Sequence, residues 1–406
     1  MTVEAEVAAV FRAECGRIVA TLIRMTGDWD LAEECVQDAF AQALERWPRD
    51  GVPHRPGAWL TTAARNRALD RLRRSAVEAT KLREVVLLPA NETETDDSGI
   101  QDDLLRLIFT CCHPALPLEA RVALTLRTVA GLTTAEIARA FLVPEPTMAK
   151  RLVRAKQKIR NAAIPYRVPP AHLLPERLGG VLGVLYLLFS EGYAASAGAD
   201  LVRQGLCADA IRLAGTLADL MPDEPEALGL RALMLLHDAR RTSRLDDTGD
   251  LVLLADQDRT DWHADLIAEG VRLLDSALRR GRPGPYQVQA AIAACHATAV
   301  DAADTDWAQI ALLYGELAKL TPSPVVELNR AVAVAMADGP AAGLAIVEQL
   351  AGALDGYHLL PATRADLLRR LNRTDEAATA YREALALAPT DVERRYLAAR
   401  LAETEK

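Results

Sequence analysis

The sequence predicts an all-α protein in which two small helical domains precede a longer helical repeat domain. Ala, Leu, Arg and Glu are abundant, whereas aromatic residues make up only 4% of the chain, and those four residue types lose little free energy on entering a helix. Apolar residues recur at helical spacing along most of the 406 residues. Beyond residue 170, amphipathic segments also recur at a fixed interval, which is typical of repeat proteins.

Residues 1–80 are expected to form the first helical domain. Amphipathic runs cover residues 3–25 and 31–47, and the proline-containing stretch Pro48–Pro56 indicates a loop. A third amphipathic helix is expected over residues 57–74. Three helices with one apolar face each can enclose a small core.

An acidic linker is expected over residues 81–101. The stretch 89–103 holds six acidic residues, no basic residue, a proline and a glycine, a composition typical of flexible segments. Helical periodicity then covers residues 102–164, and four prolines in 165–175 mark the next boundary. We therefore expect a second helical domain between these two breaks.

The second domain ends in the pattern of a helix-turn-helix, residues 131–160. Thr133 or Thr134 can cap a first helix, and two prolines suit the first turn of a second one, where a missing N–H does no harm. The second helix has an apolar stripe formed by Met148, Leu152, Ala155 and Ile159. From residue 147 to 167 there are seven basic residues and no acidic one. A basic second helix of this kind is what reading the DNA major groove requires.

Two charged helices in the first domain are less decisive. The helix at 57–74 follows Pro56 with a tryptophan and a series of outward-facing arginines, and the helix at 31–47 begins with acidic and polar side chains. Arginines on a helix face can serve solubility alone, and acidic residues at a helix N-terminus are favoured by the helix dipole. Neither helix indicates a function by itself.

Taken in order, these segments resemble the extracytoplasmic-function (group IV) RNA polymerase sigma factors. DLAEECVQDAFAQALERW (30–47) is similar to region 2.2, GAWLTTAARNRALDRLRR (57–74) to regions 2.3–2.4, and residues 131–160 to region 4.2. The resemblance assigns sigma region 2 to residues 1–80 and region 4 to residues 102–164. The motifs LIFTCCHPAL and YLLFSEGYAAS, with the repeats, resemble the subgroup that carries a C-terminal tetratricopeptide domain.

The resemblance implies core RNA polymerase and promoter DNA as partners. The polymerase would be contacted at its β flap and its β′ clamp helices, the latter by Asp30, Glu33, Glu34, Gln37 and Asp38. The −10 element would be bound by Trp59, Arg65, Asn66, Arg67, Asp70, Arg71, Arg73 and Arg74, with the loop Pro53–Ala58 helping to hold a flipped base. The −35 element would be read by Thr147, Lys150, Arg151, Arg154, Lys156 and Lys158. Promoter melting needs pockets for unstacked bases beside cationic phosphate contacts, which these residue types can supply.

Two features depart from the family pattern. Leu142 replaces the usual glycine of the helix-turn-helix turn, and the second helix starts Pro146-Thr147-Met148-Ala149-Lys150-Arg151 in place of G-T-V-K-S-R. We expect the fold to tolerate both changes and the −35 sequence to differ from that of typical members.

Residues 171–406 are expected to form a tetratricopeptide-like α-solenoid. Three amphipathic segments start 34 residues apart, at Trp307, Ala341 and Asp375, and an earlier one starts at Cys207. The last unit matches the repeat pattern at Ala377, Tyr381, Ala384 and Pro389. A two-helix unit cannot bury its own apolar face, so the units should stack, with residues 240–260 interrupting the period.

The net charge of −9 is unevenly distributed. Residues 1–170 hold 24 basic and 22 acidic residues, whereas residues 171–406 hold 23 and 34. We expect the acidic repeat domain to regulate the chain, by contacting either the sigma domains or a protein or peptide partner in its concave face.

Two other functions remain open: a helix-turn-helix regulator that acts without polymerase, and a repeat scaffold whose N-terminal half only docks partners. An enzyme is not expected, because the chain lacks paired carboxylates, a Ser–His–Asp order or a metal-ligand cluster, and no cofactor is implied. Cys111-Cys112-His113 does not have metal-site spacing, so a structural role or a redox-responsive thiol is expected. Ser190–Tyr193 can be structural, a pocket or a domain contact.

A cytoplasmic protein is expected, with no contact to a membrane. The first ten residues contain Glu4 and Glu6 and no basic start, and the longest apolar run, Leu178–Phe189, is too short to span a bilayer. The six cysteines are scattered, so we expect no disulfide framework.

Overall fold

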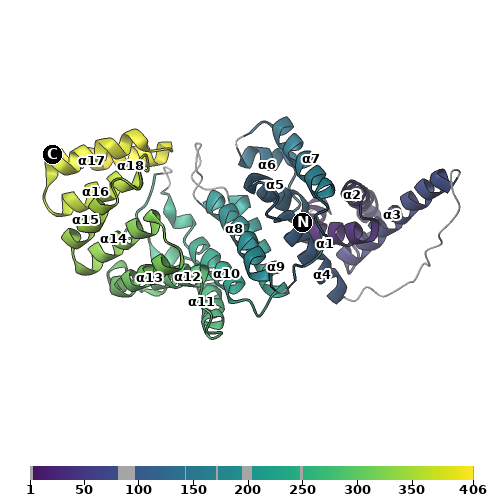
Figure 1. The fold of residues 1–406 in the computed structure, drawn as a ribbon, viewed down its shortest axis with the longest axis horizontal. Coiled ribbons are helices and arrows are strands. Elements are labelled where there is room, and N and C mark those ends of the chain that lie inside the picture. Colours follow the sequence, from purple (N-terminus) through teal and green to yellow (C-terminus); the bar gives the residue numbers. More distant parts are fainter. Residues whose placement is uncertain are drawn as a thin grey trace. The chain divides into compact units, whose positions relative to one another are not determined.

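The computed structural model describes residues 3–80, 97–141, 143–170, 172–193, 204–246 and 250–405. Within these ranges the chain is helical with no β-strand, as the sequence predicts (Figure 1). It divides into two compact units, unit 1 (residues 1–185) and unit 2 (residues 186–406).

The first half of unit 1 contains α1 (Val3–Thr26), α2 (Trp29–Asp50) and α3 (Pro56–Thr80), which pack on one another. The three expected helices are confirmed, but the expected loop Pro48–Pro56 is shorter than predicted. Pro48 lies in the last turn of α2, where its ring removes only one backbone hydrogen bond. Gly51 ends this helix with a φ of 81°, a conformation that favours glycine.

Aromatic pairs form part of this core. Phe11 of α1 meets Phe40 of α2 edge to face, with ring centroids 4.7 Å apart. Trp47 of α2 is buried and meets Trp59 of α3 in the same manner at 5.7 Å. The phenylalanine pair joins α1 to α2, and the tryptophan pair holds α3 against α2 and so helps to set where the arginines of α3 lie.

The second half of unit 1 contains α4 (Asp97–Cys111), α5 (Leu118–Thr128), α6 (Thr134–Ala140) and α7 (Glu145–Asn161). The linker prediction is wrong for residues 97–101, which are helical, while residues 81–96 lie outside the described residues. Acidic residues at the start of α4 suit the positive end of the helix dipole. Asp103, in the stretch taken as flexible, is only 1% exposed.

Helices α6 and α7 form the expected helix-turn-helix. Thr133 and Glu136 make a reciprocal capping box: the Thr133 hydroxyl accepts from the Glu136 N–H at 3.1 Å, and the Glu136 carboxylate accepts from the Thr133 N–H at 2.7 Å. The predicted stripe is buried in full, namely Met148, Leu152, Ala155 and Ile159. Leu142, in the turn, lies outside the described residues.

Helix α8 (Leu174–Tyr193) spans the division between the units. In unit 1, Arg177 donates to the carbonyl oxygen of Phe109 at 2.7 Å, so the first turn of α8 packs with α4. The division between the two compact units lies within α8, between Leu185 and Tyr186.

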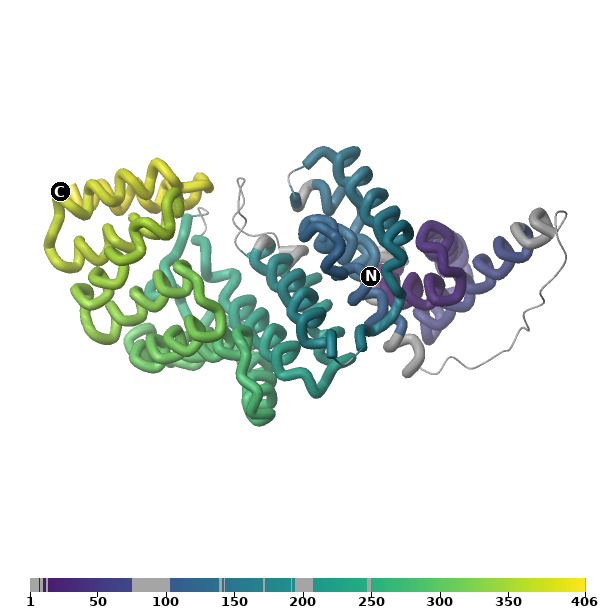
Figure 2. Tube along the Cα trace, in the orientation of Figure 1, coloured from purple at the N-terminus to yellow at the C-terminus, as the bar shows by residue number. Residues whose placement is uncertain are grey.

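Unit 2 consists of paired helices that follow one another in chain order from teal to yellow (Figure 2). Their bounds are α9 (Gln204–Leu220), α10 (Pro225–Asp238), α11 (Ala264–Leu278), α12 (Pro285–Thr298), α13 (Trp307–Leu320), α14 (Pro324–Asp338), α15 (Pro340–Gln349), α16 (Leu359–Arg370), α17 (Thr374–Leu387) and α18 (Asp391–Thr404). The segments expected 34 residues apart are α13, α15 and α17, each the second helix of a pair. The solenoid prediction is thus confirmed for this part of the chain.

Small residues let these helices pack closely. In α17, Ala377 and Ala384 are fully buried, and Tyr381 between them is 2% exposed. In α15, a Cβ added to Gly343 would lie 2.5 Å from the Ala331 carbonyl oxygen of α14, closer than atoms can approach. The repeat pattern of small residues therefore reflects the space between neighbouring helices.

The period is interrupted, as predicted, between α10 and α11. Residues 240–262, here called the α10–α11 connection, contain two 3-10 turns, Thr242–Arg244 and Arg259–Asp261, and a single bridge between Leu245 and Leu251. Residues 247–249 within it lie outside the described residues.

Candidate polymerase and nucleic-acid interface

The outer face of α7 carries the residues expected to read DNA. Four of them are exposed and lie opposite the buried stripe: Thr147, Lys150, Arg154 and Lys158. Arg151 is partly buried at the edge of this face. With Pro144 at its N-cap, the helix starts at Glu145, so Thr147 and Lys150 lie in its first two turns, the part that contacts base edges in helix-turn-helix proteins.

Lys156 differs from the expectation for a DNA contact. Its side chain is 12% exposed, and its Nζ lies 3.0 Å from Asp30 Oδ1 and 3.0 Å from Glu33 Oε2 on α2. Arg160 also approaches Asp30, at 3.9 Å. The helix expected to read the −35 element thus meets the acidic helix expected to bind polymerase.

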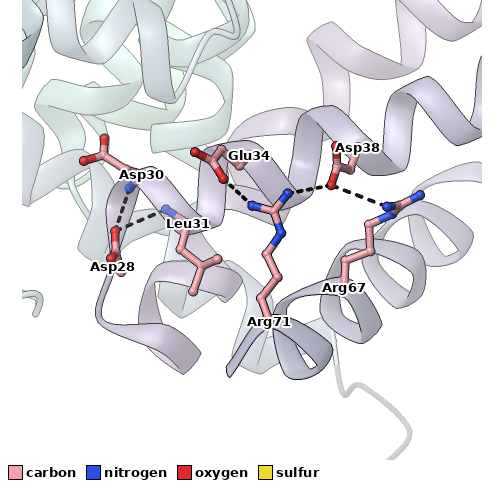
Figure 3. Close-up of polar contacts among 7 residues, drawn as sticks. All are labelled: Asp28, Asp30, Leu31, Glu34, Asp38, Arg67 and Arg71. Carbon is pink, nitrogen blue, oxygen red and sulfur yellow. Dashed lines mark hydrogen bonds and ion pairs between the residues drawn. The ribbon is translucent and has the colours of Figure 1, made fainter. Parts of the chain in front are cut away.

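The rest of the acidic face pairs with α3 (Figure 3). Arg71 lies between Glu34 and Asp38, with its Nη1 paired to Glu34 and its Nη2 3.0 Å from Asp38 Oδ2. Arg67 reaches the same Asp38 oxygen at 3.4 Å. The hydrogen bond with Glu34 raises the pKa of the Arg71 guanidinium, which stays charged.

Asp28 has a structural role within this surface. Its carboxylate accepts from the backbone N–H groups of Asp30 and Leu31 at 2.9 and 3.1 Å, and so caps α2 (Figure 3). This cap fixes the first turn of α2, where the acidic face begins. Gln37, the one uncharged residue expected to contact polymerase, is exposed.

The residues expected to bind the −10 element are divided between core and surface. Trp59 is partly buried against Trp47, so it supports α3 more than it offers a stacking face. Arg65 is partly buried, and the exposed members are Asn66, Arg67, Asp70, Arg73 and Arg74. Asp70 and Arg73 lie within 3.9 Å of each other. The structure therefore places a mainly basic, exposed surface along α3.

The expected loop Pro53–Ala58 is only partly a loop, because Pro56–Ala58 form the first turn of α3. A Cβ added to Gly57 would lie 2.9 Å from the carboxyl carbon of Glu14 on α1, so this flexible side chain would have to shift. This segment therefore lies at the N-terminus of α3, the helix that carries the exposed arginines.

A buried carboxylate that the sequence did not single out joins the two halves of unit 1. Asp103 of α4 pairs with Arg24 of α1 at 2.7 Å and with Arg106 at 3.6 Å. The Tyr166 hydroxyl lies 3.1 Å from the carbonyl oxygen of Asp103 and 2.9 Å from that of Ala20, and burial raises its pKa. The sequence signal for this buried carboxylate is its position directly before the apolar run of α4.

Cys111, Cys112 and His113 form a buried helix end. The Cys112 sulfur lies 3.5 Å from the Thr125 hydroxyl, and burial raises the pKa of this thiol to about 11. The pKa of Cys111 is also raised well above its usual value by burial. His113 Nδ1 accepts from the backbone N–H of Ala115 at 3.2 Å. These contacts indicate a structural role, since a reactive thiol needs a lowered pKa.

Four family models match parts of the chain. They are Sigma-70 region 2 at residues 10–77, Sigma-70 region 4 at residues 106–159, a family of unknown function (DUF6596) at residues 177–278, and a tetratricopeptide repeat at residues 362–391. The first two models cover α1–α3 and α4–α7, and the last covers the α16–α17 pair.

Curated relatives agree with these models. An uncharacterized protein of Rhizobium meliloti (strain 1021) is 46% identical over 385 residues, which are 93% of this chain and 91% of that protein. The ECF RNA polymerase sigma factor SigK of Mycobacterium ulcerans (strain Agy99) is 31% identical over 155 residues, 36% of this chain and 80% of SigK. The probable ECF RNA polymerase sigma factor SigI of Mycobacterium tuberculosis is 26% identical over 170 residues, 41% of this chain and 58% of SigI. No solved structure matches the chain.

Among the described residues, no helix combines the length and the apolar character that crossing a bilayer requires.

Proposed function

Because the chain belongs to the ECF RNA polymerase sigma factors, we propose that it binds core RNA polymerase and directs it to promoters. In this proposal the acidic face of α2 contacts the β′ clamp helices, region 4 contacts the β flap, the surface of α3 binds the −10 element, and α7 reads the −35 element. The protein would act in the cytoplasm, where its polymerase and promoters are.

The observation that carries the proposal is the two-sided character of α7. Its apolar stripe is buried against α5 and α6, and the opposite face presents Thr147, Lys150, Arg154 and Lys158 to solvent. A helix with this exposure can enter the major groove while its basic residues contact phosphates. The acidic face of α2 gives the same unit a second, chemically opposite surface, which suits a protein partner better than DNA.

A second candidate, a DNA-binding regulator that acts without polymerase, is favoured by one observation. All four acidic residues expected to contact polymerase are engaged in ion pairs within unit 1, namely Asp30, Glu33, Glu34 and Asp38. Polymerase would have to replace these pairs. The regulator has no such requirement, but it leaves the arginine surface of α3 without a role.

Binding to core polymerase distinguishes the two candidates. Reversing both charges, Glu34→Lys with Asp38→Lys, should weaken association with core polymerase at least about tenfold, since opposite charges across an interface become like charges. The matched control is Glu45→Lys, an exposed residue of the same helix for which no contact is proposed, and it should bind normally. Equal binding by all three proteins would contradict the polymerase contact.

We also propose that unit 2 regulates this activity. Run-off transcription with core polymerase, on the promoter upstream of the protein's own gene, can compare the full chain with a chain ending at Tyr193, after α8. The full chain should support promoter-specific transcripts, and truncation should change their amount. Identical output from both proteins under every condition would leave regulation by unit 2 without support.

A further inference from the structure

The paired helices of unit 2 enclose a cavity of about 480 Å³. It is lined by the C-terminal half of α10, by α12, by α13 and by the start of α14, and Leu254 of the α10–α11 connection borders it. This volume lies within the range of sites for small organic ligands, about 300–1,000 Å³.

One end of the cavity is cationic. Arg240 lines it, and the guanidinium carbon of neighbouring Arg244 lies 4.0 Å from the Tyr193 ring centroid. Arg244 also donates to the Tyr193 carbonyl oxygen. Among the residues that the structure describes, neither arginine forms an ion pair with a carboxylate. A charge held near a cavity without an opposite charge calls for an anion.

Two histidines beside these arginines are held neutral. Burial, followed by the charges of Arg240 and Arg244, lowers the pKa of His237 to about 3. Burial and the charges of Arg240 and Arg259 lower the pKa of His296 to about 4. Both Nδ1 atoms are buried and have no hydrogen-bond partner in the described part of the chain. Both histidines line the cavity, so their rings lie where a bound ligand would contact them.

The remaining wall is apolar with a few amides. Leu233, Ile292 and Leu317 provide apolar surface, and Gln289 and Asn329 provide hydrogen-bonding groups. Arg244 does not line the cavity, and Arg240, which also lies over the Tyr193 ring at 5.8 Å, is the one charged side chain among the described residues of the lining. A ligand with a single negative charge and an apolar body matches this lining.

The α10–α11 connection favours a compact ligand over an extended peptide. Leu253 borders a second cavity, of about 280 Å³, between α14, α16 and α18, whereas the next residue, Leu254, borders the first one. Asp250 pairs with Arg395 of α18 at 2.5 Å, which ties the connection to the last helix. A peptide running along these helices would have to displace the connection. The excess of 34 acidic over 23 basic residues in 171–406 also disfavours an acidic polypeptide.

We propose that unit 2 binds a small organic monocarboxylate in this cavity, with the carboxylate on Arg240 beside the rings of His237 and His296, and the apolar body against Leu233, Ile292 and Leu317. The binding site goes beyond promoter recognition and is measurable without polymerase or DNA. A negative result for the binding site therefore leaves the proposed promoter recognition intact, and a negative result for promoter recognition leaves the binding site intact.

Calorimetry on the full chain tests the site with three probes, hexanoate, 3-phenylpropanoate and indole-3-acetate. At least one should bind, and its uncharged amide should bind about ten- to a hundredfold more weakly, because it lacks the charge-assisted hydrogen bond. Arg240→Gln should reduce affinity by a similar factor. Arg279→Gln, which replaces an exposed arginine at the C-terminal end of α11 that does not line the cavity, should leave the affinity unchanged.

Two further measurements compare a small acid with the C-terminal carboxylate of a peptide and add a variant in case Arg240→Gln misfolds. An N-acetylated Ala-Leu hexapeptide ending in Phe with a free C-terminus should bind more weakly than 3-phenylpropanoate. Arg240→Lys keeps the charge and should retain part of the affinity if Arg240→Gln fails to fold. The proposal is overturned if no probe binds at millimolar concentration, if acid and amide bind equally, if Arg240→Gln and Arg240→Lys bind as well as the natural chain, or if the peptide alone binds.

Discussion

Single ionisable residues, held beside charged partners near or far in the sequence, organise both units. Asp103 is 1% exposed and pairs with Arg24, 79 residues away. Lys156 is held between two carboxylates of α2, and His237 is held beside arginines with its Nδ1 unpartnered in the described structure. Because burial makes charge expensive, each of these residues makes stability or binding depend on its protonation or its partner.

The two partly buried histidines, His237 and His296, predict that unit 2 loses stability in acid. Their pKa values, about 3 and about 4 in the folded chain, lie below the usual 6.5, so below about pH 6.5 the unfolded chain binds more protons and unfolding becomes easier. Between pH 7 and pH 5 each group should lower the free energy of unfolding by about 2 kcal/mol. Urea unfolding of the natural chain and of His237→Gln at both pH values measures this.

The variant should lose less stability between the two pH values than the natural chain does. His172→Gln, which replaces an exposed histidine, serves as the control and should follow the natural chain. An identical loss in the His237 variant would show that this histidine is accessible to protons in the folded state.

Helices and their ends were largely predictable, because they depend on local sequence. The stripe of α7 from Met148 to Ile159, the Thr133 cap and the 34-residue spacing of α13, α15 and α17 all follow from periodicity and capping. Pro48 and the start of α4 at Asp97 were assigned wrongly. Proline and acidic residues were taken as signs of a loop. The last turn of a helix tolerates a proline, and the first turn favours acidic residues.

The candidate site was predictable only as a set of surfaces. Spacing placed Thr147, Lys150 and Arg154 on the outer face of α7, where they lie. It could not place Lys156 against α2, because that contact joins residues 126 apart in the sequence and depends on how the helices pack. The arginine and histidines of the cavity were missed for the same reason, since the sequence marked their surroundings only as a break in the repeat.

Close packing between α14 and α15 gives a prediction about one glycine. Gly343→Ala should lower the free energy of unfolding by about 1–3 kcal/mol, because the new methyl group would meet the Ala331 carbonyl oxygen and Ala335 at 2.5 Å. Gly315→Ala, in α13, has no atom within 4 Å of the new methyl group and should be neutral or stabilising by about 0.5–1 kcal/mol. Denaturant unfolding compares the two, and equal effects would mean that α14 and α15 do not approach this closely.

Across unit 1 as a whole, the helix-turn-helix contacts the acidic helix: Lys156 of α7 forms ion pairs with Asp30 and Glu33 of α2. Lys156→Gln removes the ion pairs that Asp30 and Glu33 make with this lysine and should strengthen binding to core polymerase about three- to tenfold, measured without DNA by fluorescence anisotropy. Lys158→Gln, on the exposed face of the same helix, should leave this affinity unchanged. Weaker binding by the Lys156 variant would indicate that the contact with α2 assists polymerase instead of competing with it.

Arg71 has a thermodynamic consequence of its own. It is bound by the two carboxylates that polymerase is proposed to take, and a DNA phosphate would use the same guanidinium. Any ligand that binds Glu34 and Asp38 frees Arg71 to donate to a DNA phosphate and so raises the affinity for DNA. By linkage, bound DNA raises the affinity for that ligand by the same factor. Such a chain would hold polymerase loosely away from a promoter and firmly on one, so that assembly and target search become a single cooperative event.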